Sequence, residues 1–279
     1  MARCARRECG AWRPDVLARQ GGVGVVLERA WYCSRRCVER AAAERLEMAR
    51  TELPAPAPRA IPPLKLGMLL VHQGAVTPVQ LATALEAQQK SGHRLGHQLQ
   101  ELTFVSQPEL LRALAAQSGA PWLPVLDPRR VRNVPSALGP NVVRALGLVP
   151  FEVETARHRV KVACAAPVPR LALRALSELT GWVADPFIVA DDALPELLSA
   201  YENGVEVRQS SGVLGVLTPY AAATRIAQVA SAGRETRLAH ARCDPYLWVR
   251  VENGSEVDDL IVGATDTKEQ SWQAAPTLH

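Results

Sequence analysis

The sequence predicts an α+β protein built from several small units, and three observations support this fold class. Apolar residues recur at helical spacing between residues 64 and 119. Between residues 120 and 203, short apolar runs that suit strands alternate with helical segments. Four of the six cysteines lie within the first 37 residues, ahead of a proline-rich stretch. The chain therefore divides into a cysteine-rich segment, a helical part, a small α/β part and a further small α+β unit.

The composition is that of a globular protein, with 48% hydrophobic and 22% charged residues among 279. No uncharged apolar run reaches the roughly 18 residues of a membrane span, and the N-terminus lacks the apolar core of a signal peptide. We therefore expect a cytoplasmic protein that does not insert into membranes. In a reducing compartment, clustered cysteines favour a metal site over disulfides.

The first segment, residues 1–50, carries the cysteines as two close pairs, Cys4-x4-Cys9 and Cys33-x3-Cys37. Zinc takes four tetrahedral ligands and binds thiolates well, so these pairs predict a structural Zn²⁺ site. A hairpin of residues 22–27 and 30–32 would bring the pairs together, and a helix would follow from Cys33. The alternative is four unligated thiols in a small helical segment.

The stretch Tyr-Cys-Ser-Arg-Arg-Cys at residues 32–37 resembles the end of treble-clef zinc fingers. Such fingers bind protein or nucleic acid. The segment has eleven arginines against six acidic residues, which is compatible with nucleic acid but more typical of a solvated basic helix face. With a net charge of only +4, we consider a nucleic-acid partner the weaker interpretation.

Residues 51–63 alternate proline with other residues, which predicts an extended linker. The helical part, residues 64–119, follows. Thr77 precedes a proline at the first position of one helix, and Ser106 with Glu109 predicts a capping box for another. Gly92 and Gly119 are expected to end these helices.

The α/β part, residues 120–203, is predicted to contain three strands and two helices. The strands are expected at 148–153, 160–165 and 186–189, and the helices at 171–179 and 192–201, the second capped by Asp191 or Asp192.

After a second predicted linker at residues 204–218, we expect a small α+β unit over residues 219–264 and a flexible tail over 265–279. A helix is predicted at 220–231, followed by strands at 237–243, 246–251 and 257–262. Asn253-Gly254 predicts a tight turn between the last two strands.

The helical part contains an internal repeat of two 24-residue units separated by five residues. Each unit begins with a basic residue followed by Leu-Gly, and each has leucine at positions 17 and 21 and glutamine at position 24. The repeated residues are Lys65, Leu66, Gly67, Leu81, Leu85 and Gln88 in the first unit, and Arg94, Leu95, Gly96, Leu110, Leu114 and Gln117 in the second.

This repeat resembles the N-terminal domain of bacterial type II secretion and type IV pilus assembly ATPases (the GspE/MshE N-terminal family). The resemblance continues through the α/β part to about residue 203. In that family the paired units form a cyclic di-GMP site, so the resemblance implies that the twelve repeated residues bind this dinucleotide. It also implies contacts with secretion or pilus machinery.

The residue types suit such a ligand. Glycine lets backbone amides approach phosphate, and arginine stacks on guanine or donates to its acceptor edge. The chain departs from the family at Lys65, which lacks the planar guanidinium, at Gln100, where an apolar residue is expected, and at Thr103, which replaces the turn glycine Gly74. An asymmetric or degenerate site is therefore expected, and the alternative is that the repeated leucines are helix-packing core only.

No enzymatic activity is expected of this chain. It lacks the phosphate-binding G-x-x-x-x-G-K-[ST] loop that ATP hydrolysis requires. His72, His93 and His97 lie near the repeat starts, but we find no carboxylate or cysteine that partners them by spacing. Cys164 and Cys243 are expected to be buried thiols. The sequence thus favours a cyclic di-GMP-sensing module, with a structural adapter of pilus or secretion machinery as the alternative.

Overall fold

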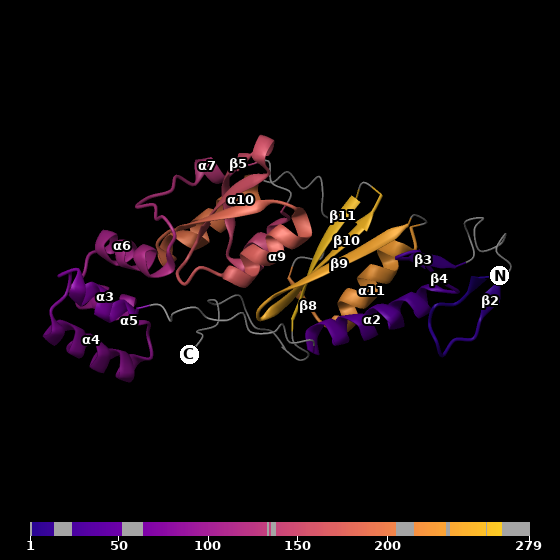
Figure 1. Cartoon of the computed structure of the whole chain (residues 1–279), viewed down its shortest axis with the longest axis horizontal. Coiled ribbons are helices and arrows are strands. Elements are labelled where there is room, and N and C mark those ends of the chain that lie inside the picture. Colours follow the sequence, from indigo (N-terminus) through magenta and orange to yellow (C-terminus); the bar gives the residue numbers. More distant parts are fainter. Residues whose placement is uncertain are drawn as a thin grey trace. The chain divides into compact units, whose positions relative to one another are not determined.

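The computed structural model describes residues 2–13, 24–51, 64–132, 134, 138–204, 215–232, 235–254 and 256–263 (Figure 1). The chain forms two compact units, one of Met1–Leu53 with Gln209–His279 and one of Pro54–Arg208. The predicted mixture of helices and strands is confirmed. Within the described ranges, no helix is both long enough and apolar enough to cross a membrane.

The first unit is built on a six-stranded sheet in the order β4-β3-β9-β10-β11-β8. At its centre, β9 (Thr236–Cys243), β10 (Tyr246–Asn253) and β11 (Glu256–Val262) form an antiparallel meander. Gly254, in the predicted turn between the last two strands, has a φ of 66°. Glycine adopts this left-handed conformation without steric cost, which explains the Asn-Gly pair.

The N-terminal hairpin extends the same sheet. β3 (Val25–Leu27) pairs with β4 (Ala30–Tyr32) and runs parallel to β9, with Leu27 opposite Thr236. The backbone N–H of Glu28 also donates to the carbonyl of Thr236, at 2.8 Å.

This arrangement differs from the division predicted from the sequence, in which residues 1–50 and 219–264 are separate units. In the structure both belong to one compact unit and share one sheet. The strands that join them lie about two hundred residues apart in the chain, so local sequence patterns carry no signal for their pairing.

Two helices cover this sheet, α2 (Arg35–Thr51) and α11 (Pro219–Ala230), and they lie side by side (Figure 1). Alanines on both helices are fully buried and allow the close approach. The helix that was expected to start at Cys33 begins at Arg35. Residues of the two helices that contribute to the common core are Val38, Ala42, Leu46, Ala222, Ala223, Ile226 and Ala227.

The predicted linker 204–218 is partly wrong. Its last residues form β8 (Val216–Leu217), which pairs in parallel with β11, and Thr218 caps α11. Gly204 is the last residue of a helix, and residues 205–214 lie outside the described part of the chain. The predicted linker after Thr51 and the predicted tail 265–279 lie outside it as well.

The second unit begins with the four helices of the tandem repeat. They are α3 (Leu66–His72), α4 (Pro78–Ser91), α5 (Leu95–Glu101) and α6 (Gln107–Ser118). Each 24-residue unit thus folds as one short helix followed by one longer helix.

The predicted ends of the longer helices are confirmed. Thr77 and Ser106 form capping boxes with Gln80 and Glu109 respectively, so each satisfies backbone donors at a helix start. Gly92 and Gly119 end the same helices in the left-handed conformation.

In each repeat unit, the turn after the short helix has the same backbone conformation, although its residue is glycine in the first unit and threonine in the second. Gly74 has a φ of 70° in the first unit, and Thr103, its counterpart, has a φ of 55°. The replacement of glycine by threonine at this position therefore does not abolish the turn. A β-branched residue in the left-handed region costs roughly 1–2 kcal/mol, so the surrounding helices impose the turn on Thr103.

The α/β part forms a three-stranded sheet of β5 (Val149–Glu154), β6 (Arg159–Cys164) and β7 (Val183–Ile188). β5 and β6 are antiparallel, whereas β7 is parallel to β6 and is reached through α9 (Arg170–Thr180). All three strands lie within a few residues of their predicted positions.

Three helical segments of this part differ from the prediction. α7 (Arg129–Arg132) and α8 (Pro140–Leu146) were not expected. The helix expected from Asp192 begins as a 3-10 turn at Asp191–Ala193 and continues as α10 (Leu194–Gly204). Neither aspartate is therefore the cap of the α-helix.

The helical and α/β parts of the second unit share a small core. Leu111 and Ala115 of α6 cluster with Ala120, Ala166 and Ile188, all of which are buried. The backbone N–H of Leu123 donates to the carbonyl of Ile188 at 2.9 Å. The repeat is therefore fixed directly to the sheet.

Exchange of the turn residues between the two repeat units tests whether the turn at Thr103 is strained. We expect Thr103→Gly to raise the free energy of unfolding by about 0.5–1 kcal/mol, because relief of the left-handed strain exceeds the entropy that glycine adds to the unfolded chain. Gly74→Thr should lower it by a similar amount, since the space around the Gly74 Cβ position is open and only backbone strain is introduced. Urea unfolding of both variants measures this, and shifts of the same sign would contradict it.

Candidate functional site

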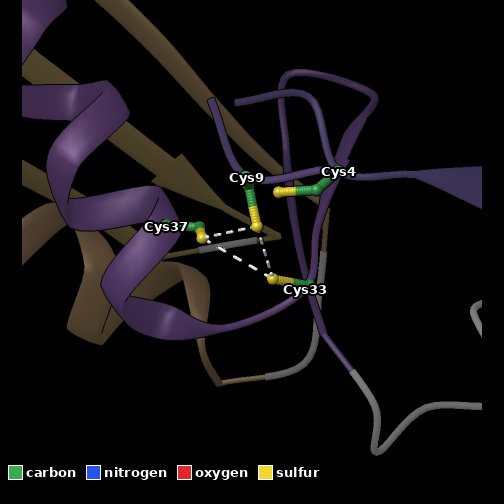
Figure 2. Close-up of side chains that lie close together, drawn as sticks. All are labelled: Cys4, Cys9, Cys33 and Cys37. Carbon is green, nitrogen blue, oxygen red and sulfur yellow. Dashed lines mark hydrogen bonds between the residues drawn. The ribbon is translucent and has the colours of Figure 1, made fainter. Parts of the chain in front are cut away.

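The four N-terminal cysteines come from the loop between β1 and β2, the end of β4 and the start of α2. Cys4 directly follows β1 (Ala2–Arg3), and Cys9 lies in the turn that leads to β2 (Trp12–Arg13). Cys33 follows β4, and Cys37 lies in the first turn of α2. Figure 2 shows the four side chains gathered around one space between the turn and the helix.

The distances between their sulfur atoms suit a tetrahedral metal. Cys9 Sγ lies 3.4 Å from Cys33 Sγ and 3.6 Å from Cys37 Sγ, and the last two are 3.5 Å apart. All four sulfurs lie within 4.8 Å of one another. Zinc bound to thiolates at about 2.3 Å separates neighbouring sulfurs by about 3.8 Å. None of the four is in a disulfide, so the donor set fits Zn²⁺ in number, chemistry and spacing.

Backbone hydrogen bonds hold the first pair despite its unusual four-residue gap. The N–H of Cys4 donates to the carbonyl of Ala11, and the N–H of Ala5 donates to the carbonyl of Trp31 in β4, both at 2.9 Å. The N–H of Cys9 donates to the carbonyl of Arg6 at 3.1 Å and closes the turn. The wider spacing is therefore accommodated by a turn anchored to the hairpin.

Within the cluster, the thiols of Cys9 and Cys33 differ in pKa. The backbone N–H of Ala11, together with the thiols of Cys33 and Cys37, lowers the pKa of Cys9 to about 7. Burial raises the pKa of Cys33 to about 12. Cys9 thus loses its proton more readily than Cys33. A positive ion held between the four sulfurs would favour the thiolate form of all of them.

Four thiolates complete a tetrahedral shell and leave no position open for substrate, so this is the geometry of a structural site. The other two cysteines are buried and are not part of this cluster, and burial raises the pKa of both Cys164 and Cys243 to about 12. Their expected role as buried thiols agrees with this environment.

The residues expected to bind a nucleotide occupy equivalent positions in the two repeat units. Lys65 and Arg94 are the N-cap residues of α3 and α5, with nearly the same backbone angles, and both are exposed. Leu66 and Leu95 are half-buried, as are Gln88 and Leu114. The structure thus reproduces the twofold pattern of the sequence, although the two units do not contribute identical surfaces.

The repeated glycines and leucines also have a packing role. A Cβ atom on Gly67 would lie 2.7 Å from a methyl carbon of Leu81, and one on Gly96 would lie 3.2 Å from a methyl carbon of Leu110. Glycine therefore makes room for the leucine of the following helix in both units. Leu110 is buried, whereas Leu85 in the first unit keeps 41% of its surface exposed.

Gln117, at the end of the second unit, reaches the start of the first. Its side-chain amide donates to the carbonyl of Leu64, next to Lys65, at 2.7 Å. The end of α6 therefore lies beside the start of α3, so the last helix of the repeat is joined to the beginning of the first.

Arg94 has partners that the sequence did not indicate. Its guanidinium donates to Asp191 Oδ2 at 3.2 Å and to the carbonyl of Ala166 at 3.3 Å, both in the α/β part. Burial raises the pKa of Asp191, and the charge of Arg94 opposes this shift. Asp191 lies almost one hundred residues from Arg94, so only the fold reveals the pair.

A matched pair of variants tests the cysteine cluster. We expect the purified chain to carry about one zinc per molecule and Cys37→Ser to carry almost none, because the site then loses one of its four thiolates. Cys243→Ser, which alters a buried thiol of the same unit, should keep its zinc. Elemental analysis of protein prepared without added metal measures this; less than half an equivalent in the unaltered chain would count against the site.

Comparisons with known proteins bear on the repeat-containing part. No protein-family model matches the chain. It is 26% identical over 126 residues to the type IV pilus assembly ATPase PilB of Thermus thermophilus, a match that covers 44% of this chain and 14% of that protein.

Among solved structures, the chain is 29% identical to MshE with cdg, covering 49% of this chain and 98% of that chain with a TM-score of 0.39. For the N-terminal domain of XpsE the identity is 19%, the coverage is 49% and 92%, and the TM-score is 0.36. The tandem repeat and the sequence similarity to PilB together show that about half of this chain is similar to the N-terminal domain of type II secretion and type IV pilus assembly ATPases.

Proposed function

We propose that this chain is a non-catalytic module that binds cyclic di-GMP through its tandem repeat and acts through protein contacts in a type II secretion or type IV pilus system. The observation that carries the proposal is the structural equivalence of the two repeat units. Each presents an exposed basic residue at the start of a short helix, followed by Leu-Gly, with leucines from the next helix beside it. A pseudo-symmetric dinucleotide suits two such units.

Each unit offers complementary chemistry for one half of the ligand. The cation of Lys65 or Arg94 attracts a phosphate or an acceptor edge of guanine. Leu85 and Leu114, at equivalent positions of α4 and α6, supply an apolar surface for a base. The units differ in strength, because only Arg94 has a planar guanidinium that can stack on a base.

Arg94 also suggests how binding could be communicated. The guanidinium of Arg94 is paired with Asp191 through Nη1, so a nucleotide that takes this donor would replace the carboxylate. The exchange would release one of the polar contacts between the repeat and the α/β part. Binding would thereby loosen the connection between these two parts of the unit.

The cysteine-rich unit has a structural role in this proposal. A bound Zn²⁺ would fix the turn, the hairpin and α2 relative to one another, in a segment whose apolar core is otherwise shared with strands from the far end of the chain. This chain contains no phosphate-binding loop, and we assign it no ATPase activity.

Titration calorimetry with cyclic di-GMP tests the proposal through a matched set of variants. We expect Arg94→Ala to weaken binding by roughly 10- to 100-fold, since hydrogen bonds to charged groups contribute about 1.5–3 kcal/mol. Asp191→Asn breaks the same ion pair but keeps the guanidinium, so it should bind at least as well as the unaltered chain. Arg112→Ala, on the exposed side of α6, should have no effect.

These variants separate ligand contact from structural damage. Equal losses in Arg94→Ala and Asp191→Asn would show that the ion pair only stabilises the fold. No heat of binding with ~100 µM cyclic di-GMP, a concentration that reveals even a weak specific site, would contradict the proposal.

Lys65→Arg tests the asymmetry between the units. It restores at the first unit the planar side chain that the second unit already has, and the position is an exposed N-cap, so the fold should tolerate it. We expect the affinity for cyclic di-GMP to rise several-fold, measured by the same titration. Unchanged affinity would show that the first unit does not contact the base.

One set of observations favours a second candidate, a structural adapter with a degenerate nucleotide site. Gly67 and Gly96 are explained by helix packing, Lys65 replaces arginine, and Arg94 is already paired. In that case the chain would dock on pilus or secretion proteins without a nucleotide. The calorimetric result distinguishes the two, because the adapter requires no binding.

A further inference from the structure

A group of three potential metal ligands lies at the start of the second repeat unit. His93 directly precedes Arg94, and His97 and Glu101 lie one turn apart on α5. One ligand atom from each lies within 4.8 Å of the other two. The prediction that these histidines have no carboxylate partner is wrong, because Glu101 lies beside both.

The distances are close to those of a coordination shell. Glu101 Oε2 is 3.4 Å from His97 Nδ1 and 4.0 Å from His93 Nδ1. A tetrahedral ion with bonds of about 2.1 Å to nitrogen and oxygen separates neighbouring ligand atoms by about 3.4 Å. The two imidazole rings meet edge to face with their centroids 4.9 Å apart.

A buried glutamine contacts two of the three potential ligands. The Gln98 side chain is only 5% exposed, and its Nε2 lies 2.7 Å from Glu101 Oε2 and 3.3 Å from His93 Nδ1. Burial of an amide is costly unless it is hydrogen-bonded. Gln98 thus draws Glu101 and His93 together, and an ion bound to Glu101 Oε2 and His93 Nδ1 would take the place of these two hydrogen bonds.

The first repeat unit shows that the fold does not require this polar group. At the positions equivalent to His93, His97 and Gln98 it has Leu64, Met68 and Leu69, and His72 stands at the position of Glu101. The backbone of the two short helices is otherwise equivalent, down to the N-cap angles. Because apolar residues serve the same fold in the first unit, the polar set in the second calls for a separate explanation.

We propose that His93, His97 and Glu101 form a binding site for a divalent transition-metal ion. Two imidazoles and one carboxylate suit Zn²⁺, Ni²⁺ or Co²⁺, and three protein ligands leave at least one position for water or another donor. All three side chains are exposed, so an ion can enter from solvent. In the sequence, His93 and His97 flank the Arg94-Leu95-Gly96 start of the repeat, although the proposal does not depend on nucleotide binding.

Titration of the zinc-loaded, tag-free chain with Co²⁺ tests this site separately from the cysteines. We expect one additional equivalent, with visible bands of a nitrogen- and oxygen-bound ion and without the thiolate charge-transfer band that the cysteine site would give. His97→Ala and Glu101→Gln should each weaken this binding by roughly tenfold or more, measured by calorimetry. Glu101→Gln keeps a side chain that can bond to Gln98, so its effect reports on metal rather than on packing.

His72→Ala is the matched control, because it removes the exposed histidine at the equivalent position of the first unit. It should bind the additional ion like the unaltered chain. Absence of the additional equivalent, or equal binding by the unaltered chain and both ligand variants, would overturn the proposal. Cys37→Ser should lose only the cysteine-bound ion, which keeps the two sites distinguishable.

Discussion

The pairing of β3 with β9 is the constraint on which most of the first unit depends. Leu27 opposite Thr236 joins a hairpin near the start of the chain to a meander near its end. Once this register is fixed, α2 and α11 lie on the same sheet and bury a common core. The cysteine cluster depends on it too, because its turn is hydrogen-bonded to β4, the edge strand that β3 connects to the sheet.

Sequence patterns predicted the elements better than their connections. Capping boxes at Thr77 and Ser106, the Asn253-Gly254 turn and the strands of the α/β part are local features, and local residue preferences determine them. The parallel contacts of β3 with β9 and of β8 with β11 have no local signature. For the same reason, the predicted linker at 204–218 contains a strand, since two residues become a strand only through their partner.

The residues of the candidate sites could likewise be predicted only where they lie close together in the sequence. The four cysteines were predictable because thiols at short spacing have few other uses in a reducing compartment. The partner of Arg94 was not predictable, because Asp191 reaches it only through the packing of α6 on the α/β sheet. Glu101 could have been found, since it follows His97 by one helical turn. Comparison of the two repeat units is what gives that spacing its significance.

The discontinuous first unit has a consequence for the order of folding. Its two halves are separated by the whole of Pro54–Arg208, so its sheet cannot close until the last strands have been synthesised. Closing a long loop costs entropy, and prior folding of the intervening unit reduces the number of conformations that must be searched. Meanwhile the N-terminal half would expose the apolar side of α2. An ion held by the four cysteines would keep this half ordered until the strands of the C-terminal half have been synthesised. The metal would thus stabilise the N-terminal half before its shared apolar core can form.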